Sequence, residues 1–181
     1  NTLLPIISDD KEKAIQLVEE KLNKFSLIFS VNWHQMMYKK LGILKPIQED
    51  KVLVDMLLQL MDNHQADYTN TFAALTLNKV SDDNLFSSSK FNEWHKQWEN
   101  RINHTDNRIN ALKLMQTQNP LVISRNHLVE SALENAIKGN KSQFNELLNL
   151  ISKPYNYKSN HDNFQTMPAG FDDCYKTFCG T

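Results

Sequence analysis

The sequence predicts an all-α protein, an irregular bundle of several helices that ends in an extended tail. Its 181 residues contain only four glycines and five prolines, too few for closely spaced strands joined by tight turns. Apolar residues recur every three to four positions over long stretches, which is the period of one helix face. This periodicity stops after Pro154, so residues 155–181 are predicted to be a tail that lies on another part of the protein.

The first long helix is predicted to begin after Asp9 and to end before Gly42. Asp9 followed by Glu12 resembles a capping box, and acidic residues suit the positive end of a helix. Apolar residues then follow the helical period at Ala14, Leu17, Val18, Leu22, Phe25, Phe29, Trp33, Met36 and Leu41. Gly42 suits the position just past a helix end, and Pro46 prevents the helix from continuing.

Three further helical stretches are predicted before residue 118. One begins near Glu49, and another begins at Asp67, whereas the polar segment 81–89 is predicted to be a loop. Helical spacing then returns at Phe91, Trp94, Trp98 and Ile102, followed by Ile109, Leu112 and Met115. We interpret Trp94 and Trp98 as core residues, because two aromatic side chains at helical spacing pack in a core more often than they form a ligand platform.

The segment NPLVISRNHLVESALENAIKGN, residues 119–140, is predicted to form one long helix that Gly139 ends. Its buried face is predicted to contain Leu121, Leu128, Val129, Ala132, Leu133, Ala136 and Ile137. Arg125 and Asn126 would lie in its first turns as structural residues. We interpret Arg125 as the partner of a carboxylate that joins two helices, with an interdomain or ligand contact as the alternative.

The last predicted helix begins at Asn140. Asn140 suits a helix cap, and Gln143 stands at the capping-box position three residues later. Its buried residues are predicted to be Phe144, Leu147, Leu148 and Ile151.

The composition argues against two classes of partner. A net charge of −1 does not suit nucleic-acid binding, which needs a clustered cationic surface. The longest apolar runs fall well short of the roughly 20 residues that span a bilayer, so no membrane span is expected. The chain begins with Asn1 and has no signal-peptide pattern, and we expect it to be part of a longer protein.

Residues suited to catalysis are scarce in this sequence. The four glycines are dispersed rather than clustered, so no phosphate-binding loop is predicted. Cys174 and Cys179 lack the paired spacing of a zinc site, and two cysteines favour a reducing compartment. We therefore assign no catalytic, cofactor-binding or metal-binding residue, and retain Cys179 as a candidate redox residue.

Several sequence motifs together resemble one known family. They are YKKLGI at 38–43, ADYTNTFAAL at 66–75, the segment 119–140, KPY at 153–155 and FCGT at 178–181. With these motifs the chain resembles the C-terminal part of the selenoprotein O family, called YdiU in bacteria. Its members are protein adenylyltransferases with a kinase-like (pseudokinase) fold. Ser124, His127, Gly180 and Thr181 depart from the family pattern.

The resemblance implies an activity that lies outside this segment. Family members transfer AMP from ATP to Ser, Thr or Tyr hydroxyls of proteins with Mg²⁺ or Mn²⁺, and their catalytic residues belong to the preceding kinase-like core. Residues 1–78 would form the end of the kinase-like C-lobe, 79–154 a helical extension and 155–181 the tail. The implied partners are the core of the same chain and the protein substrates. Cys179 would carry a regulatory thiol–disulfide link.

Two other functions stay open at this stage. One is a free-standing helical interaction module whose groove is lined by Phe91, Trp94 and Trp98. The other is a thiol-redox protein that uses Cys174 and Cys179. If the core is absent, the apolar surface left uncovered predicts self-association. The resemblance places the protein in the cytoplasm if it is bacterial, and in mitochondria for eukaryotic relatives.

Overall fold

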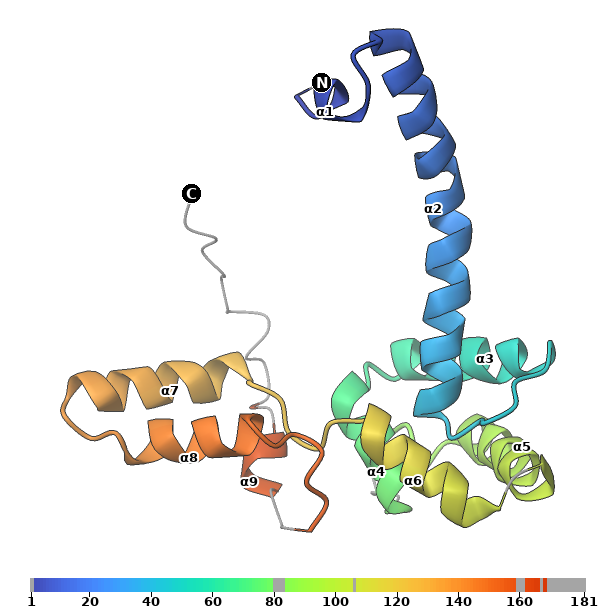
Figure 1. Cartoon of the computed structure of the whole chain (residues 1–181). Coiled ribbons are helices and arrows are strands. Elements are labelled where there is room, and N and C mark those ends of the chain that lie inside the picture. The colour runs from blue at the N-terminus through green and yellow to red at the C-terminus, as the bar shows by residue number, and fades with distance from the viewer. Residues whose placement is uncertain (1, 80–83, 106, 159–161, 167, 169–181) are drawn as a thin grey trace.

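The computed structural model describes residues 2–79, 84–105, 107–158, 162–166 and 168, and every regular element in these residues is a helix. The all-α prediction is therefore confirmed. The elements are α1 Leu4–Ile7, α2 Lys11–Lys40, α3 Asp50–Asn63, α4 Tyr68–Leu77, α5 Ser89–Thr105, α6 Arg108–Gln118, α7 Asn126–Ile137, α8 Ser142–Ile151 and α9 Asp162–Gln165. Figure 1 shows three parts: a body of α3 to α6, the long α2 rising from it, and the α7–α8 hairpin beside it.

Helix α2 begins one residue later than the capping box predicted. The carboxylate of Asp10, not Asp9, accepts the backbone N–H groups of Glu12 and Lys13 at 2.9 and 3.2 Å. At the other end Gly42 has φ +73°, and an added Cβ there would lie 3.0 Å from the carbonyl oxygen of Ala111. Glycine is therefore required at this turn both by its backbone conformation and by the close approach of α6.

The core of the body surrounds two stacked tryptophans on α5. The rings of Trp94 and Trp98 lie 5.9 Å apart at an angle of 4°, and both side chains are fully buried. Their indole N–H groups donate to the carbonyl oxygens of Leu53 and Leu41, each at 2.8 Å. These bonds satisfy the polar atom of each buried ring and join α5 to α3 and to the end of α2.

The predicted boundary at residue 78 passes through this core. Buried residues from both sides of it, such as Phe72 and Phe91, belong to the same cluster. The division into 1–78, 79–154 and 155–181 stays a prediction.

The prediction of one helix over 119–140 was wrong for its first seven residues. Helix α7 begins only at Asn126, because the preceding segment makes its backbone bonds elsewhere. The N–H of Leu121 donates to the carbonyl oxygen of Pro154 at 2.7 Å, and the Tyr157 hydroxyl donates to the carbonyl oxygen of Asn119 at 2.6 Å. Residues 119–125 therefore run beside the returning chain instead of forming helical turns.

Helices α7 and α8 form an antiparallel hairpin that extends away from the body (Figure 1). The turn between them contains Gly139 at φ +90°, as a helix stop requires. Helix α8 begins at Ser142, whose N–H donates to the Asn140 side chain. The predicted capping role of Gln143 was wrong, because its side-chain oxygen accepts hydrogen bonds from Ser131 and Asn135 of α7.

Part of the predicted hairpin core lies on its surface. Leu133, Ile137, Phe144 and Leu148 were expected to be buried, but they are 47, 86, 37 and 49% exposed. The physical reason is that α7 and α8 pack mainly on each other, so each helix covers only one side of its partner.

Some of the predicted tail belongs to the described residues. Residues 155–158 form a turn, and 162–165 form the short helix α9. Phe164 of α9 packs against the small apolar cluster of Ala73, Leu121 and Val122. Cys174 and Cys179 lie outside the described part of the chain.

Candidate docking surface

The most unusual surface of the protein is the apolar side of α2. Leu22, Phe25 and Phe29 are 63, 62 and 58% exposed, although their spacing is that of a buried helix face. The rings of Phe25 and Phe29 stack on each other at 6.0 Å. Ile28 and Met36 are also exposed on or beside this face, whereas the exposed Leu27 and Val31 lie on the opposite side of the helix. We call Leu22, Phe25, Ile28, Phe29 and Met36 the α2 docking surface.

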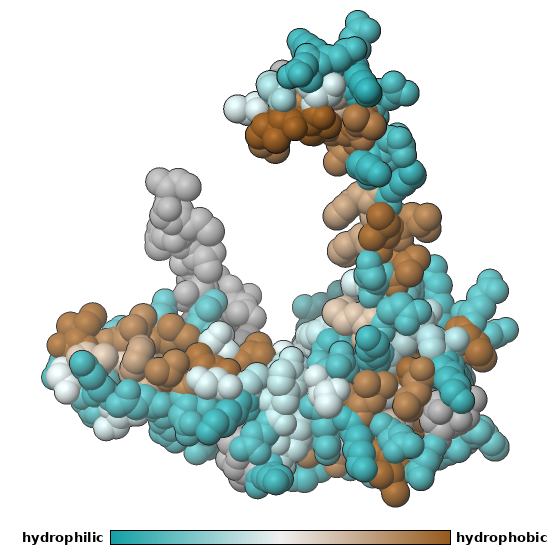
Figure 2. Space-filling model, in the orientation of Figure 1, coloured by the Kyte–Doolittle hydropathy of each residue, from teal (hydrophilic) through white to brown (hydrophobic). Residues whose placement is uncertain are grey.

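Figure 2 shows where this surface lies in the molecule. Apolar side chains follow α2 upward from the body, and a second apolar band follows the α7–α8 hairpin. The two bands border a common hollow between α2 and the hairpin (Figure 2). Exposed apolar surfaces of this extent mark interaction sites in soluble proteins.

A partly buried lysine fixes the lower end of α2. The ammonium group of Lys40 donates to the side-chain oxygen of Asn119 at 3.1 Å and to the carbonyl oxygen of Gln118 at 3.3 Å. It also lies 4.9 Å from the ring centre of Phe72 and 5.4 Å from that of Tyr68, close enough for cation–π attraction. Desolvation by burial lowers the pKa of Lys40.

The fully buried Asn119 joins three parts of the chain. Its side-chain NH₂ donates to the carbonyl oxygen of Lys40 and to the hydroxyl of Thr76, both at 2.9 Å. Its own carbonyl oxygen accepts the Tyr157 hydroxyl, and burial raises the pKa of that hydroxyl. Asn119 therefore connects the end of α2, helix α4 and the segment that returns from α8.

Arg125 anchors the hairpin to the body. Its side chain is 5% exposed, and the guanidinium donates to the Asp67 carboxylate at 2.6 Å and to the Asn70 side-chain oxygen at 3.1 Å. Asp67 also caps α4, because its other oxygen accepts the N–H of Asn70 at 2.8 Å. The carboxylate partner is thus Asp67, and Arg125 stands immediately before α7 rather than within it. Asn126 is exposed at the first position of that helix.

A second buried ion pair closes the loop between α2 and α3. The guanidinium of Arg101 donates to both carboxylate oxygens of Asp50, at 2.7 and 2.8 Å, and Asp50 also accepts the N–H of Ile47 at 2.7 Å. The same guanidinium donates to the carbonyl oxygen of Lys45 at 2.8 Å. Sequence reasoning missed this pair, since its members are 51 residues apart and neither belongs to a local motif.

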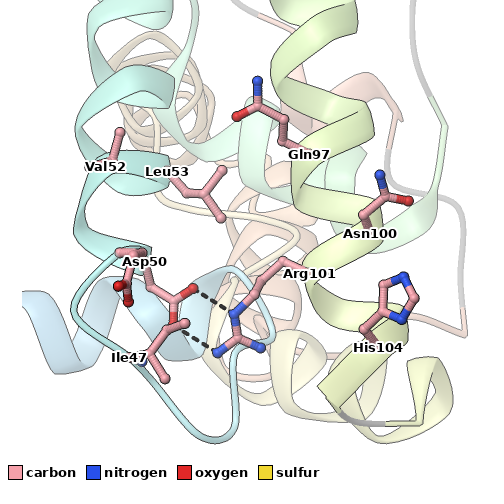
Figure 3. A pocket seen from close by; sticks show the side chains of 9 residues that line it. Ile47, Asp50, Val52, Leu53, Gln97, Asn100, Arg101 and His104 are labelled. Carbon is pink, nitrogen blue, oxygen red and sulfur yellow. Dashed lines mark hydrogen bonds and ion pairs between the residues drawn. The ribbon is translucent and has the colours of Figure 1, made fainter.

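The Asp50–Arg101 pair lies at the edge of a cavity of about 590 Å³ between α3 and α5. The cavity is lined by Gln97, Asn100 and His104 from α5 and by Val52 and Leu53 from α3, all of which Figure 3 labels. The two charges are paired with each other, and each side chain also bonds to a backbone group of the loop, at Ile47 or Lys45. We therefore interpret the pair as a structural contact that holds the loop between α2 and α3 in place.

The proposed groove of a free-standing module is contradicted by the structure. Phe91, Trp94 and Trp98 are at most 1% exposed, so they line no surface groove. Within the described ranges, no group of three or more His, Cys, Asp or Glu side chains is placed to bind a metal ion. None of the helices found there is both long and apolar enough to cross a membrane.

The fold and its exposed surface define a class: an all-α region with exposed apolar side chains along one long helix. Comparison with known sequences identifies that class more closely. The family described as Protein adenylyltransferase SelO matches residues 2–152. Proteins named Protein nucleotidyltransferase YdiU are 40% identical in Bacillus cereus, 38% in Bacillus thuringiensis and 39% in Clostridium beijerinckii, and each match covers 99% of this chain. The chain therefore belongs to the SelO family of protein nucleotidyltransferases.

The chain is much shorter than these relatives. It spans 37% of the length of each.

Proposed function

We propose that this chain is the non-catalytic C-terminal region of a protein adenylyltransferase and that it buttresses the kinase-like core. That core would transfer AMP from ATP to Ser, Thr or Tyr hydroxyls of protein substrates in the cytoplasm. ATP and Mg²⁺ or Mn²⁺ would bind in the core. Membership of the SelO family and the 37% share of the relatives' length support this proposal.

The observation that carries the proposal is the α2 docking surface. Full burial of one Leu or Phe side chain stabilises a protein by about 1.5–3 kcal/mol. Leu22, Phe25 and Phe29 are all more than half exposed, so covering them would contribute several kcal/mol to the contact. A core seated in the hollow between α2 and the hairpin would cover this surface.

A transfer assay tests the non-catalytic role. The 181-residue chain would be incubated with α-labelled ATP, a mixture of proteins, and Mg²⁺ or Mn²⁺. We expect no labelled protein above a control without the chain. Metal-dependent transfer of AMP by this chain alone would overturn the proposal.

A complementation experiment tests the buttressing role. The Bacillus cereus relative would be truncated so that it lacks the third that matches this chain, and the chain would be added separately. We expect addition to raise the melting temperature of the truncated relative and to increase its AMP transfer. The Phe25→Glu/Phe29→Glu variant serves as the control, because it changes the α2 docking surface and leaves the buried body intact. If the unmodified chain and the variant had equal effects on the truncated relative, the proposed contact would be contradicted.

A redox link at Cys179 is a second, separate part of the proposal. Cys179 lies outside the described residues, so its support is the similarity of the FCGT ending to the family's terminal cysteine. The Cys179→Ser variant of a chain joined to its core should lose the difference in AMP transfer between oxidised and reduced samples. A retained difference would reject a role for this thiol.

A further inference from the structure

The second half of α2 differs from the first half in its charge. Residues 25–38 include no Asp, Glu, Lys or Arg. Met37 and Tyr38 are buried in the body, whereas most of residues 25–36 are exposed. The preceding turns of the helix carry Lys11, Glu12, Lys13, Glu19, Glu20, Lys21 and Lys24. Because surface helices ordinarily carry charged side chains, residues 25–36 have the composition of a buried stretch.

Apolar side chains also stand on two opposite sides of this stretch. Leu27 and Val31 are 69 and 53% exposed, and at 3.6 residues per turn they lie opposite Phe25 and Phe29. Figure 2 shows apolar side chains along both edges of α2 above the body. A partner seated only on the α2 docking surface would leave Leu27 and Val31 in water. A helix that is apolar on more than one side is typical of a protein interior.

The side of α2 that carries Leu27 and Val31 continues the face that packs on the body. Leu27, Val31, Tyr38 and Leu41 stand at positions i, i+4, i+11 and i+14, which share one side of a helix. Tyr38 and Leu41 are 8 and 0% exposed. This apolar face is therefore longer than the part of the chain that covers it.

The size of the exposed stretch indicates what could cover it. Residues 25–36 measure about 18 Å along the axis, whereas one helix with its side chains is about 10–12 Å wide. A second copy of the chain would cover one face in a symmetric pair, and covering two opposite faces with further copies would give an open-ended assembly. One folded body on both sides of the helix avoids this. The relatives contain more chain that could form such a body, because this chain spans 37% of their length.

We propose that residues 25–36 of α2 lie inside the kinase-like core, which covers both the α2 docking surface and the opposite side at Leu27 and Val31. Helix α2 is then shared by two apolar cores, with Met37 and Tyr38 in the body of this chain and the preceding three turns in the catalytic part. The charged turns before Phe25 emerge into solvent. This inference rests on the proposed function and adds that the contact surrounds the helix.

Maleimide labelling of introduced cysteines tests the inference. Ile28→Cys reports on the α2 docking surface and Val31→Cys on the opposite side, and these residues are 56 and 53% exposed. Glu20→Cys, in the charged turns, is the matched control, because its side chain is 52% exposed. Each variant is made in the 181-residue chain and in the chain joined to its core. Mass spectrometry of proteolytic peptides assigns the label to its position, so the native cysteines remain in place.

We expect similar labelling rates at the three positions in the dilute 181-residue chain. In the joined protein, labelling at positions 28 and 31 should slow at least about tenfold relative to position 20, because an enclosed thiol reacts only when the structure opens. Val31→Ala should also lower the melting temperature of the joined protein more than that of the 181-residue chain, because it would leave a cavity only where Val31 is enclosed.

The outcomes separate this inference from the proposed function. Slower labelling at position 28 but not at 31 would show that the core covers one side only, so the proposed function would stand and the inference would fail. Unchanged labelling at both positions would contradict both. Equal slowing at position 20, or equal effects of Val31→Ala on the two proteins, would overturn the enclosure of residues 25–36.

Discussion

Two pairs of aromatic residues in this protein have the same spacing and opposite environments. Trp94 and Trp98 on α5 stack at 5.9 Å and are fully buried, whereas Phe25 and Phe29 on α2 stack at 6.0 Å and are 62 and 58% exposed. Both pairs stand four residues apart on one helix face. The comparison teaches that helical spacing defines which side chains share a face, and that the partner element decides whether the face is buried.

The two pairs also differ in their polar contacts. Each indole N–H of the α5 pair donates to a carbonyl oxygen of another segment, Leu53 or Leu41. These bonds, together with the burial of the two rings, fix the position of α5 relative to α3 and α2. The α2 phenylalanines have no polar atoms, so a surface made of them accepts a partner by apolar contact alone.

The largest expected effect comes from removing one tryptophan of the buried pair. Trp98→Ala should lower the free energy of unfolding by about 3–5 kcal/mol, because it leaves a large cavity and removes the donor to Leu41. Phe25→Ala on the exposed pair should lower it by less than about 1 kcal/mol. Urea unfolding of both variants measures the difference, and similar losses would contradict the contrast between the two faces.

The next effect concerns two ion pairs, one buried and one exposed. Asp50 is 1% exposed, so Asp50→Asn leaves the Arg101 charge without its partner and should lower the free energy of unfolding by about 3 kcal/mol. Glu20 and Lys24 on α2 are more than half exposed, and Glu20→Gln should cost less than about 0.5 kcal/mol. Urea unfolding again gives both values. If Asp50→Asn lowered the free energy of unfolding by less than Glu20→Gln, the Asp50–Arg101 pair would not be what holds the loop in place.

Self-association of the isolated chain offers a direct test of the α2 docking surface. We expect the chain to associate in sedimentation experiments, since covering Phe25 and Phe29 removes apolar surface from water. Phe25→Glu/Phe29→Glu should raise the dissociation constant at least about tenfold, or 1.4 kcal/mol. Val52→Glu changes an equally exposed residue on α3 and serves as the control. An unchanged dissociation constant in the α2 variant would assign association to another surface.

A more local effect is expected where the hairpin joins the body. Arg125→Gln removes the ion pair with Asp67 and should lower local stability of α7 and α8 by about 1–3 kcal/mol. Hydrogen exchange of the amides in α7 and α8 should therefore become faster, while exchange in α5 stays the same. A uniform increase in all helices would show that Arg125 supports the whole protein and not the hairpin alone.

The smallest effect is a pH dependence from His95. Desolvation by burial lowers the pKa of this imidazole from its ordinary value of 6.5, and Arg108 lowers it further while Glu99 opposes the shift. The unfolded chain therefore binds the proton more readily. Stability from neutral His95 is present above about pH 6.5 and is lost as the pH falls from there toward the lower pKa of the folded state.

The His95→Gln variant isolates this contribution. The difference in unfolding free energy between the unmodified chain and the variant should decrease as the pH falls through that window. A difference that increases on acidification would reverse the sign and reject burial as the cause.

Local sequence signals predicted the helices well but placed some of their ends wrongly. Capping by an aspartate before α2 was predicted, and only the choice between Asp9 and Asp10 was wrong. The start of α7 was misplaced by seven residues, because the bonds that hold residues 119–125 in a non-helical path come from Pro154 and Tyr157. A local sequence pattern cannot predict hydrogen bonds to such distant partners.

The polar anchors of the fold were only partly predictable. An arginine beside a buried face suggests a carboxylate partner, so the role of Arg125 could be anticipated. Its partner Asp67 stands 58 residues earlier, and no spacing rule connects the two. The Asp50–Arg101 pair left no signal at all, since each residue alone resembles an ordinary surface charge.

By itself the sequence determined the all-α class, the family and the faces on which apolar residues gather, because these depend on helical period, capping residues and short motifs. The tertiary structure decided which of those faces are covered. Burial depends on where distant segments lie, so the same period gives a closed core around Trp98 and an open surface around Phe25. That difference, which no local pattern contains, is the reason for proposing α2 as a docking surface.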